Sequence, residues 1–215
     1  MILALVNEKG GVGKTTIAVH LVAWLRASGV DAALVDADVQ NASSIWTAEL
    51  DKETPIYRFQ SEVELRAGLP ELEHDVIVVD GPAGLRQESR TVLLFADLVL
   101  IPCGPSVLDL RASDQGIAAL GEVRSFRGGL PQAILVPNKL QKNYGLSRQL
   151  LTTASNLDVD VGPGLGLRQA YPRSAQESTV VWNMDRSAAD ATHELVRLFH
   201  YISKYIKTNA KSVDG

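Results

Sequence analysis

The sequence has little cysteine, only a small excess of charge of one sign and no long apolar run. Cys103 is the single cysteine among 215 residues, which excludes an internal disulfide and the metal sites that need several thiolates. The formal net charge of −4 argues against a globally basic nucleic-acid binder, although a local basic patch stays possible. No apolar run approaches the ~20 residues of a membrane span, and the first one, 2–6, is too short for a secretory signal. We therefore expect a cytoplasmic protein.

The remaining composition is that of an ordinary globular protein. Hydrophobic residues make up 46% of the chain and charged residues 21%, which leaves disordered and fibrous classes aside. The length suits one domain with a sizeable core. We expect a single domain over 1–207, followed by a polar tail at 208–215.

Short apolar runs alternate with longer helical patterns. The runs are nearly continuous in Val, Ile and Leu, which is typical of strands covered on both faces; they lie at 2–6, 32–36, 75–80, 97–102 and 132–138. Helical patterns occupy 15–28, 40–50, 61–69, 86–96, 106–126, 144–155 and 187–206. This alternation predicts an α/β fold of three layers, with a mostly parallel, twisted sheet flanked by helices.

A glycine-rich segment follows the first expected strand and opens the first expected helix. Its glycines allow successive backbone N–H groups to turn inward and form an anion-binding nest at a helix N-terminus. Lys14 is then placed to reach the β- and γ-phosphates of a nucleotide, and the Thr15 hydroxyl to coordinate Mg²⁺. A plain glycine turn explains the glycines but not Gly-Lys-Thr at this offset. The expected nucleotide-binding residues are Lys9, Gly10, Gly11, Val12, Gly13, Lys14, Thr15 and Thr16.

One departure from the general phosphate-loop pattern is informative. Glu8 stands where a glycine is usual, and a second lysine, Lys9, precedes the glycine pair. In this respect the chain resembles the ParA/MinD family of deviant Walker A ATPases, whose loop reads Lys-Gly-Gly-x-Gly-Lys-Thr. The resemblance implies a P-loop NTPase fold in which Lys9 reaches across a dimer interface to the partner's ATP. From the residues alone, Lys9 is a solvated loop lysine.

Two carboxylates, Asp36 and Asp38, follow the second expected strand. Ligand groups in open α/β sheets lie at this end of the strands, although Asp residues also cap helices. The segment resembles the family's Asp-x-Asp-Pro-Gln, with Val39 in place of proline. That resemblance implies that Asp38 orients or activates the attacking water in catalysis with Lys14 and Lys9, and that Asp36 supports the Mg²⁺ site.

A third acid, Asp80, ends the run at 75–80 in the manner of a Walker B strand. Hydrophobic strands often end in Asp, so the signal gains its weight from the phosphate loop. We expect Asp80 to hold Mg²⁺ through a water. Gly81 replaces the threonine usual in relatives, so side-chain contacts from that position are left in doubt.

Asn138 stands at the end of the last expected strand of the sheet. Its amide offers a donor and an acceptor that match the N6 and N7 edge of adenine, and family members carry an adenine-reading Asn here; an Asn in an ordinary turn is equally compatible with the sequence. Further on, 167–175 resembles the family's Arg-x-Ala stretch, and loop 161–166 is a candidate for closing over the base.

The last expected helix combines an apolar stripe with basic residues. The stripe is typical of a core-facing side, and the basic residues of a solvated one. Short ParA proteins bind DNA non-specifically through basic residues near this end when dimeric, which a patch doubled across a dimer would strengthen. The resemblance implies DNA contacts by Arg168, Arg173, Arg197, Lys204 and Lys207.

Together these features indicate a ParA-type positioning ATPase. By resemblance, ATP joins two subunits, the homodimer binds nucleoid DNA, and an adaptor of ParB type stimulates hydrolysis; the cargo is a plasmid, a chromosome region or a protein body such as a carboxysome. A MinD-like membrane switch needs an amphipathic C-terminal extension, whereas 208–215 is short and polar; we expect no membrane binding. A P-loop synthetase that acts on a small molecule stays as the third alternative.

Overall fold

The computed structural model describes residues 1–84, 87–141, 145, 147, 150, 152 and 159–212, with the backbone alone over 107–116 and 207–212. The helix expected at 144–155 lies almost wholly outside the described residues. Within this part of the chain, no helix is long and apolar enough to cross a membrane.

The centre of the molecule is a seven-stranded sheet in the order β3-β2-β4-β1-β5-β6-β7. Every pairing in it is parallel. The strands are β1 (Ile2–Asn7), β2 (Ala32–Asp36), β3 (Ile56–Arg58), β4 (Val76–Ala83), β5 (Leu98–Cys103), β6 (Gln132–Pro137) and β7 (Asp160–Val161). The five expected strands are confirmed. β3 and β7 were not expected, because strands of three and two residues carry too little periodicity to detect.

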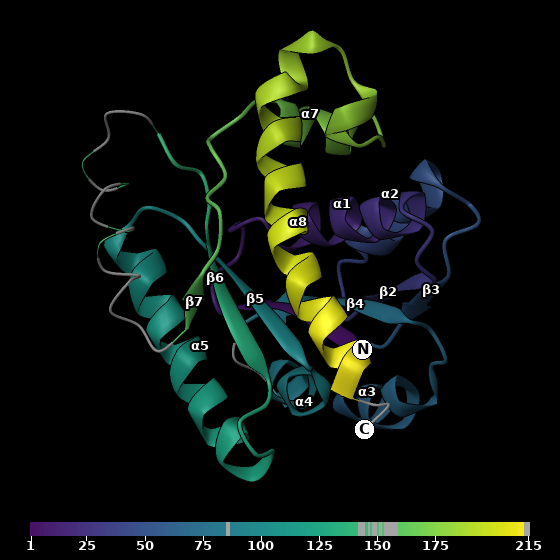
Figure 1. Cartoon of the computed structure of the whole chain (residues 1–215), viewed down its shortest axis with the longest axis vertical. Coiled ribbons are helices and arrows are strands. Elements are labelled where there is room, and N and C mark those ends of the chain that lie inside the picture. The colour runs from purple at the N-terminus through teal and green to yellow at the C-terminus, as the bar shows by residue number, and fades with distance from the viewer. Residues whose placement is uncertain are drawn as a thin grey trace.

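Helices connect the strands and cover both faces of the sheet (Figure 1). They are α1 (Lys14–Ala27), α2 (Ala42–Leu50), α3 (Glu62–Gly68), α4 (Gln87–Phe95), α5 (Val107–Phe126), α7 (Ala170–Gln176) and α8 (Ala189–Ser212). The short helix α7 was not expected as a separate element. α8 continues to Ser212, so most of the segment expected to be a frayed tail belongs to the last helix.

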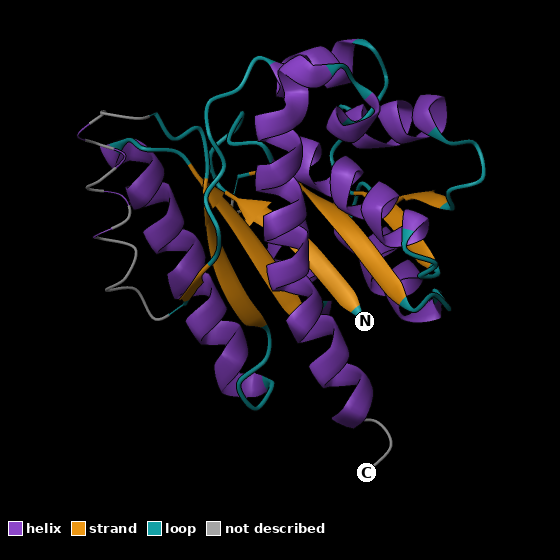
Figure 2. Ribbon diagram, turned by 45° about the horizontal axis from the view of Figure 1, so that its top comes forward, coloured by secondary structure: helices purple, strands orange, loops and turns teal. Residues whose placement is uncertain are grey.

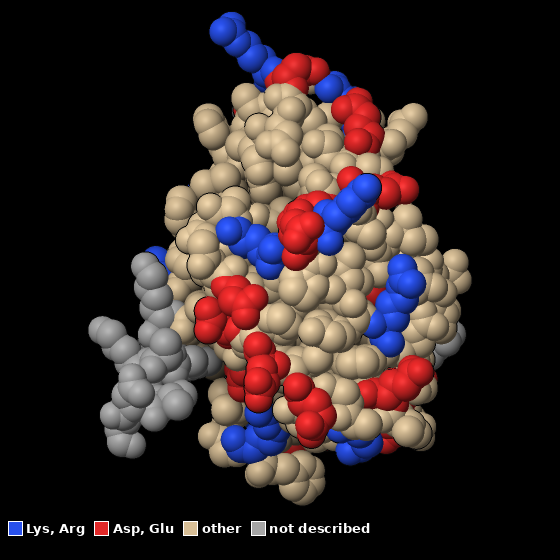
Figure 3. Space-filling model, turned by 90° about the vertical axis from the view of Figure 1, so that its right-hand side faces the viewer, with Lys and Arg blue, Asp and Glu red and all other residues tan. Residues whose placement is uncertain are grey.

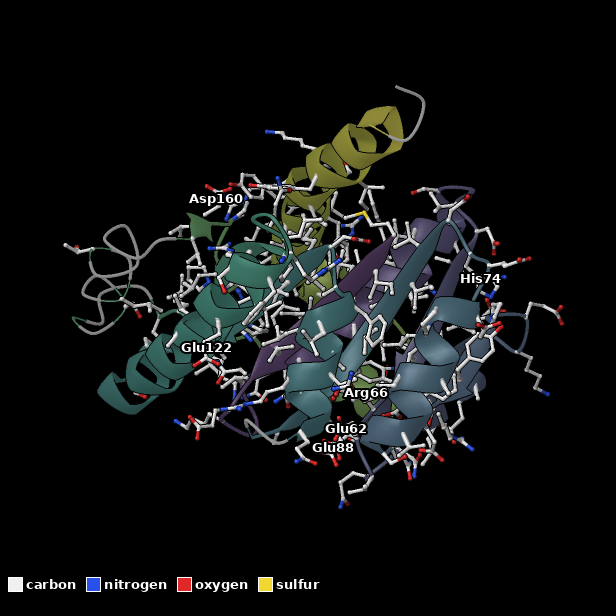
Figure 4. The ribbon with its side chains drawn as sticks, turned by 90° about the horizontal axis from the view of Figure 1, so that it is seen from below. Glu62, Arg66, His74, Glu88, Glu122 and Asp160 are labelled. Atoms are coloured by element: carbon white, nitrogen blue, oxygen red, sulfur yellow. The ribbon has the colours of Figure 1, made fainter. Side chains whose placement is uncertain are left out.

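In the central strands, successive residues point into two different hydrophobic cores. Leu3 and Leu5 of β1 join a core with α1 and α8. Helix α8 crosses one face of the sheet (Figure 2). Ala4 and Val6 join a second core, to which α3, α4 and α5 contribute. These three helices lie together on the opposite face, seen from below in Figure 4. The predicted three-layer α/β architecture is therefore confirmed, and it places the carboxyl ends of the strands at one edge, where ligands bind in such sheets.

Candidate functional site

The glycine-rich segment forms a tight loop between β1 and α1. Gly11 (φ 72°) and Gly13 (φ 102°) take up left-handed conformations that favour glycine. α1 begins directly after Gly13, has no side-chain cap and has no acidic residue in its first turn. No side chain of the described residues therefore caps its first N–H groups, which an external anion can bind.

Lys14 curls back over the loop that precedes it. Its side chain is buried, and Nζ donates to the backbone oxygens of Asn7 at 3.2 Å and Lys9 at 3.3 Å. Burial lowers the pKa of Lys14, against the opposing effect of Asp80 and Asp38. The ammonium group of Lys14 is therefore held inside the phosphate loop. A bound anion would give it charged oxygen partners in place of the neutral carbonyls.

Asn7 fixes the entrance of the loop, a role that the sequence analysis missed. Its side chain is buried, Nδ2 donates to Pro102 O at 2.7 Å, and Oδ1 accepts from Lys9 N at 2.9 Å. This amide ties the loop to strand β5 next to it. An Asn at the end of a strand, directly before a glycine loop, was the available signal.

Asp80 and Thr15 form the core of a candidate magnesium site. Thr15 Oγ1 donates to Asp80 Oδ2 at 2.8 Å, while Oδ1 of the same carboxylate is buried and has no hydrogen-bond partner among the described residues. Burial, with a smaller contribution from Asp36, raises the pKa of Asp80 to about 7. A buried acceptor with an open oxygen beside a hydroxyl fits Mg²⁺, which proteins hold through one or two carboxylates together with nucleotide phosphates. Consistently, the described residues include no group of three or more His, Cys, Asp or Glu that could hold a metal by themselves.

Asp36 lies beside Asp80 in the sheet, since the two residues are register partners in β2 and β4. It is fully buried. Oδ1 accepts from Asp38 N at 3.1 Å and Oδ2 from Ser44 N at 2.8 Å, so this carboxylate shapes the turn after β2 and holds the first turn of α2. Its support of Mg²⁺ stays a prediction.

Asp38 is partly exposed and lies at the edge of a cavity. The cavity has a volume of about 250 Å³ and is lined by Ala37, Asp38, Val39, Gln40, Gln60, Pro82, Ala83 and Glu88. Asp38 Oδ1 accepts from Gln40 N at 3.0 Å. Gly81, just before this cavity, has no room for a side chain, because a Cβ would lie 2.6 Å from Leu5 O. Close packing of β4 on β1 accounts for the missing threonine.

A second cavity, also of about 250 Å³, is lined in part by the phosphate loop. Its lining residues are Gly11, Gly13, Thr16, Ile17, Asn138, Lys139, Leu165, Gly166, Leu167, Arg168, Gln169, Tyr171 and Pro172. Largely apolar walls with a few polar groups are typical of a nucleotide-base site. The structure thus brings Asn138, the end of loop 161–166 and part of 167–175 together beside the phosphate loop.

Glu194 of α8 holds the outer wall of this second cavity, and sequence reasoning missed it. Its Oε2 accepts from Gly166 N at 2.9 Å and from Tyr171 Oη at 3.2 Å. Its Oε1 accepts from Arg168 Nη2 at 2.7 Å. The only feature of the sequence that could have indicated this role is a polar residue on the core-facing side of an amphipathic helix.

The residues expected to contact DNA have other partners in the described part of the chain. Arg168 pairs with Glu194 and also with Asp190 at 2.9 Å, and Arg173 pairs with Asp185 and Glu177. Arg197 donates to Gly164 O at 3.2 Å, and Lys204 Nζ lies 5.4 Å from the centre of the Tyr201 ring; the side chain of Lys207 lies outside the described residues.

These ion pairs leave no concentrated basic patch around Arg168 and Arg173. On the face shown in Figure 3, basic and acidic side chains are likewise interspersed. DNA contact by these residues stays a prediction.

An uncapped helix behind a glycine loop, a buried lysine and a hydroxyl–carboxylate pair beside that lysine define a nucleotide-binding protein of the P-loop class. In agreement, residues 3–196 match the CobQ/CobB/MinD/ParA nucleotide-binding domain. The chain belongs to this family.

Several relatives refine this assignment. The chain is 34% identical over 204 residues to "Maintenance of carboxysome distribution protein A" of Halothiobacillus neapolitanus, covering 90% of this chain and 94% of that protein. It is 32% identical to Protein ParA of Rhizobium radiobacter over 56% of each chain. The fold superposes on a Cyanothece McdA variant in complex with ATP with a TM-score of 0.77, over 96% of both chains at 16% identity.

Proposed function

We propose that this chain is a magnesium-dependent ATPase of the ParA type that positions a cellular cargo. The observation that carries the proposal is the hydroxyl–carboxylate pair of Thr15 and Asp80, at 2.8 Å, beside a phosphate loop that opens an uncapped helix. The ATP seen with the McdA variant and the matched nucleotide-binding family support the choice of ligand.

Each part of the site has a task in this proposal. The N–H groups at the start of α1 bind the phosphates, and Lys14 turns from its carbonyl partners toward the terminal phosphoryl group. Thr15 and Asp80 hold Mg²⁺, which supplies charge neutralisation when bound. Asp38, partly exposed in its own cavity, aligns the attacking water, and Lys9 reaches the nucleotide of a second subunit. Hydrolysis then follows from positioning and electrostatic stabilisation.

The positioning role is inferred from the relatives. The similarity to the carboxysome distribution protein covers nearly the full length of both chains, so a protein body such as a carboxysome is the favoured cargo. In this proposal an ATP-bound homodimer binds nucleoid DNA without sequence preference, and an adaptor protein stimulates hydrolysis.

Gel filtration and DNA retention, each with ATP and with ADP, test the proposal. We expect the wild-type protein to form a dimer that DNA retains, with ATP and not with ADP, and retention to fall as salt rises. Asp38→Ala is expected to trap the ATP dimer, because it removes water alignment but no phosphate contact. Asp75→Ala, at the exposed opposite end of the β4 region, is the matched control.

Two outcomes would overturn this function. An Asp38→Ala protein that never dimerises contradicts the assigned role of that carboxylate. ATP-dependent sedimentation with liposomes, together with no retention on DNA, would instead favour a MinD-like membrane switch.

A further inference from the structure

We propose that Asn138 and Lys139 are positioning residues that hold the phosphate loop in its anion-binding shape by binding two successive loop carbonyls. The inference deepens the proposed function and rests on it, because it concerns how this chain binds nucleotide phosphates. It assigns to Asn138 a role beyond reading the base.

The two side chains reach the loop from 126 and 128 positions along the chain. Asn138 Nδ2 donates to Val12 O at 2.7 Å in a buried environment. Lys139 Nζ donates to Gly11 O at 2.7 Å, at the exposed rim. Two adjacent residues after β6 therefore bind the carbonyls of two adjacent residues in the phosphate loop.

Peptide geometry links these carbonyls to the amides that bind phosphate. In a trans peptide, the C=O of one residue and the N–H of the next point in opposite directions. Holding Gly11 O toward Lys139 therefore turns Val12 N–H the other way, and holding Val12 O toward Asn138 does the same for Gly13 N–H. Without these donors, either peptide is free to rotate and present an oxygen to the phosphates, which repels them.

The residues that grip the loop are themselves fixed. Asn138 N donates to Cys103 O at 2.7 Å, which ties the segment to β5. Asn138 Oδ1 accepts from Lys139 N at 2.7 Å, and Lys139 has a left-handed φ of 56°. A non-glycine residue in that conformation is uncommon, so the turn is shaped by these contacts.

The absence of a side chain at Gly13 allows Asn138 to approach the loop closely. A Cβ at position 13 would lie only 2.4 Å from Asn138 Nδ2, so the amide packs directly on the loop backbone. Asn138 Oδ1 and one of its two N–H donors are already engaged with Lys139 N and Val12 O. One N–H and the second lone pair of Oδ1 are left, so holding the loop is a role beyond any contact that this amide makes with the base.

Affinities for three ligands separate loop positioning from base reading. Calorimetry with magnesium measures the binding of ATP, GTP and inorganic tripolyphosphate to wild type, Asn138→Ala and Lys139→Met. Loop positioning predicts that Asn138→Ala weakens all three by the same factor, roughly tenfold, as expected for the loss of one buried hydrogen bond. Lys139→Met should weaken all three by about threefold, because its bond is exposed. Lys52→Met removes an exposed lysine far from the loop and should change none.

Each other outcome has a defined meaning. The inference is overturned if Asn138→Ala keeps its tripolyphosphate affinity but loses the preference between ATP and GTP, since that identifies a base reader. For Lys139, a deficit that vanishes at about 0.5 M salt points to long-range charge and not to positioning. Should Asn138→Ala not fold, the exposed Lys139→Met decides by the same comparison. Failure of the proposed function is distinct, because then the wild type itself takes up no MgATP.

Discussion

The hydroxyl of Thr15 and the carboxylate of Asp80 meet at 2.8 Å although 65 positions separate them in the chain. They meet because β1 and β4 are parallel neighbours, so the loop after one strand and the end of the other share an edge of the sheet. Within the part of the chain that the structure describes, the second carboxylate oxygen has no hydrogen-bond partner. The protein thus keeps a buried acceptor that costs stability until a cation binds.

Replacing Asp80 with asparagine should stabilise the protein without ligand at pH 8. The folded-state pKa of Asp80 is raised from 3.8 to about 7, so the folded protein binds this proton more tightly than the unfolded chain. Stability from this group is therefore lost as the pH rises from about 4 to about 7. Asp80→Asn stays neutral, and we expect a free energy of unfolding larger by roughly 2–4 kcal/mol at pH 8.

Urea unfolding at pH 5 and pH 8 measures this effect. The difference between variant and wild type should shrink at pH 5, where the wild-type carboxyl is also protonated. The same variant should lose most of the stabilisation by MgATP that the wild type shows. Asp75→Asn, an exposed residue of the same region, is the control; an Asp80→Asn protein less stable than wild type at pH 8 contradicts the prediction.

The phosphate loop and the central strands could be predicted from the sequence because their signals are local. Five apolar runs predicted β1, β2, β4, β5 and β6, and Gly-Lys-Thr at the head of a helix predicted the loop that the structure contains. Covered parallel strands are continuous in apolar residues, and phosphate loops need glycine at fixed offsets. Both patterns can be recognised in the sequence without knowledge of the tertiary contacts.

The contacts that support the site could not be predicted, because they join distant segments. Asn7 reaches Pro102, Asn138 reaches Val12, and Glu194 reaches Gly166. None of these pairings follows from a spacing in the sequence, and the polar residues involved have ordinary alternative roles in turns and on helix surfaces. Likewise, the arginines expected to bind DNA have acidic partners that only the tertiary structure reveals.

Acid should destabilise the protein through His20. This side chain is buried where α1, α2 and the segment after α7 pack together. Its Nδ1 contacts Thr16 O at 2.7 Å, and its Nε2 accepts from Val181 N at 3.1 Å. The rings of Trp46 and Trp182 lie edge-on to it, at 5.4 and 5.5 Å. Burial lowers the pKa of His20 from 6.5 to about 4, against the opposing effect of its hydrogen bond to Thr16 O. A protonated ring would also lose the bond from Val181 N.

The pH window follows from the direction of this shift. The unfolded chain binds the proton more readily, so the contribution of His20 is complete above pH 6.5 and is lost as the pH falls toward 4. The loss amounts to roughly 3 kcal/mol at most. Urea midpoints between pH 7 and pH 4.5 should fall less in His20→Gln than in wild type. The exposed His193→Gln should follow the wild-type curve; equal slopes in all three proteins would contradict the prediction.

Glu194→Gln should weaken the base cavity and spare phosphate binding. The carboxylate holds Gly166 N, Tyr171 Oη and Arg168 at once, so loss of its charge loosens the wall. We expect about three- to tenfold weaker ATP binding, equivalent to about 0.7–1.4 kcal/mol, because Glu194 acts on the nucleotide through the wall of the cavity, with unchanged affinity for tripolyphosphate. Calorimetry with both ligands measures it, and Glu122→Gln on the exposed side of α5 is the control. Equal losses for both ligands would contradict a role confined to the base cavity.

Gly13→Ala should cost more than Gly29→Ala, although both glycines flank α1 with positive φ angles of 102° and 81°. A Cβ at Gly29 meets nothing within 4 Å, so that substitution pays only the backbone cost of about 1 kcal/mol. At Gly13 the Cβ would also strike Asn138 Nδ2 at 2.4 Å, which forces the amide off Val12 O. We therefore expect a further loss of about 1–2 kcal/mol in unfolding free energy and weaker MgATP binding for Gly13→Ala alone.

A double-mutant cycle isolates the part of this cost that comes from Asn138. In the Asn138→Ala background there is no amide for the new Cβ to strike, so Gly13→Ala should cost little more than Gly29→Ala. The coupling between the two sites, measured by urea unfolding, is then expected to equal the extra loss at Gly13. Strictly additive effects would mean that the left-handed backbone alone requires glycine there, and that Asn138 has no grip on the phosphate loop.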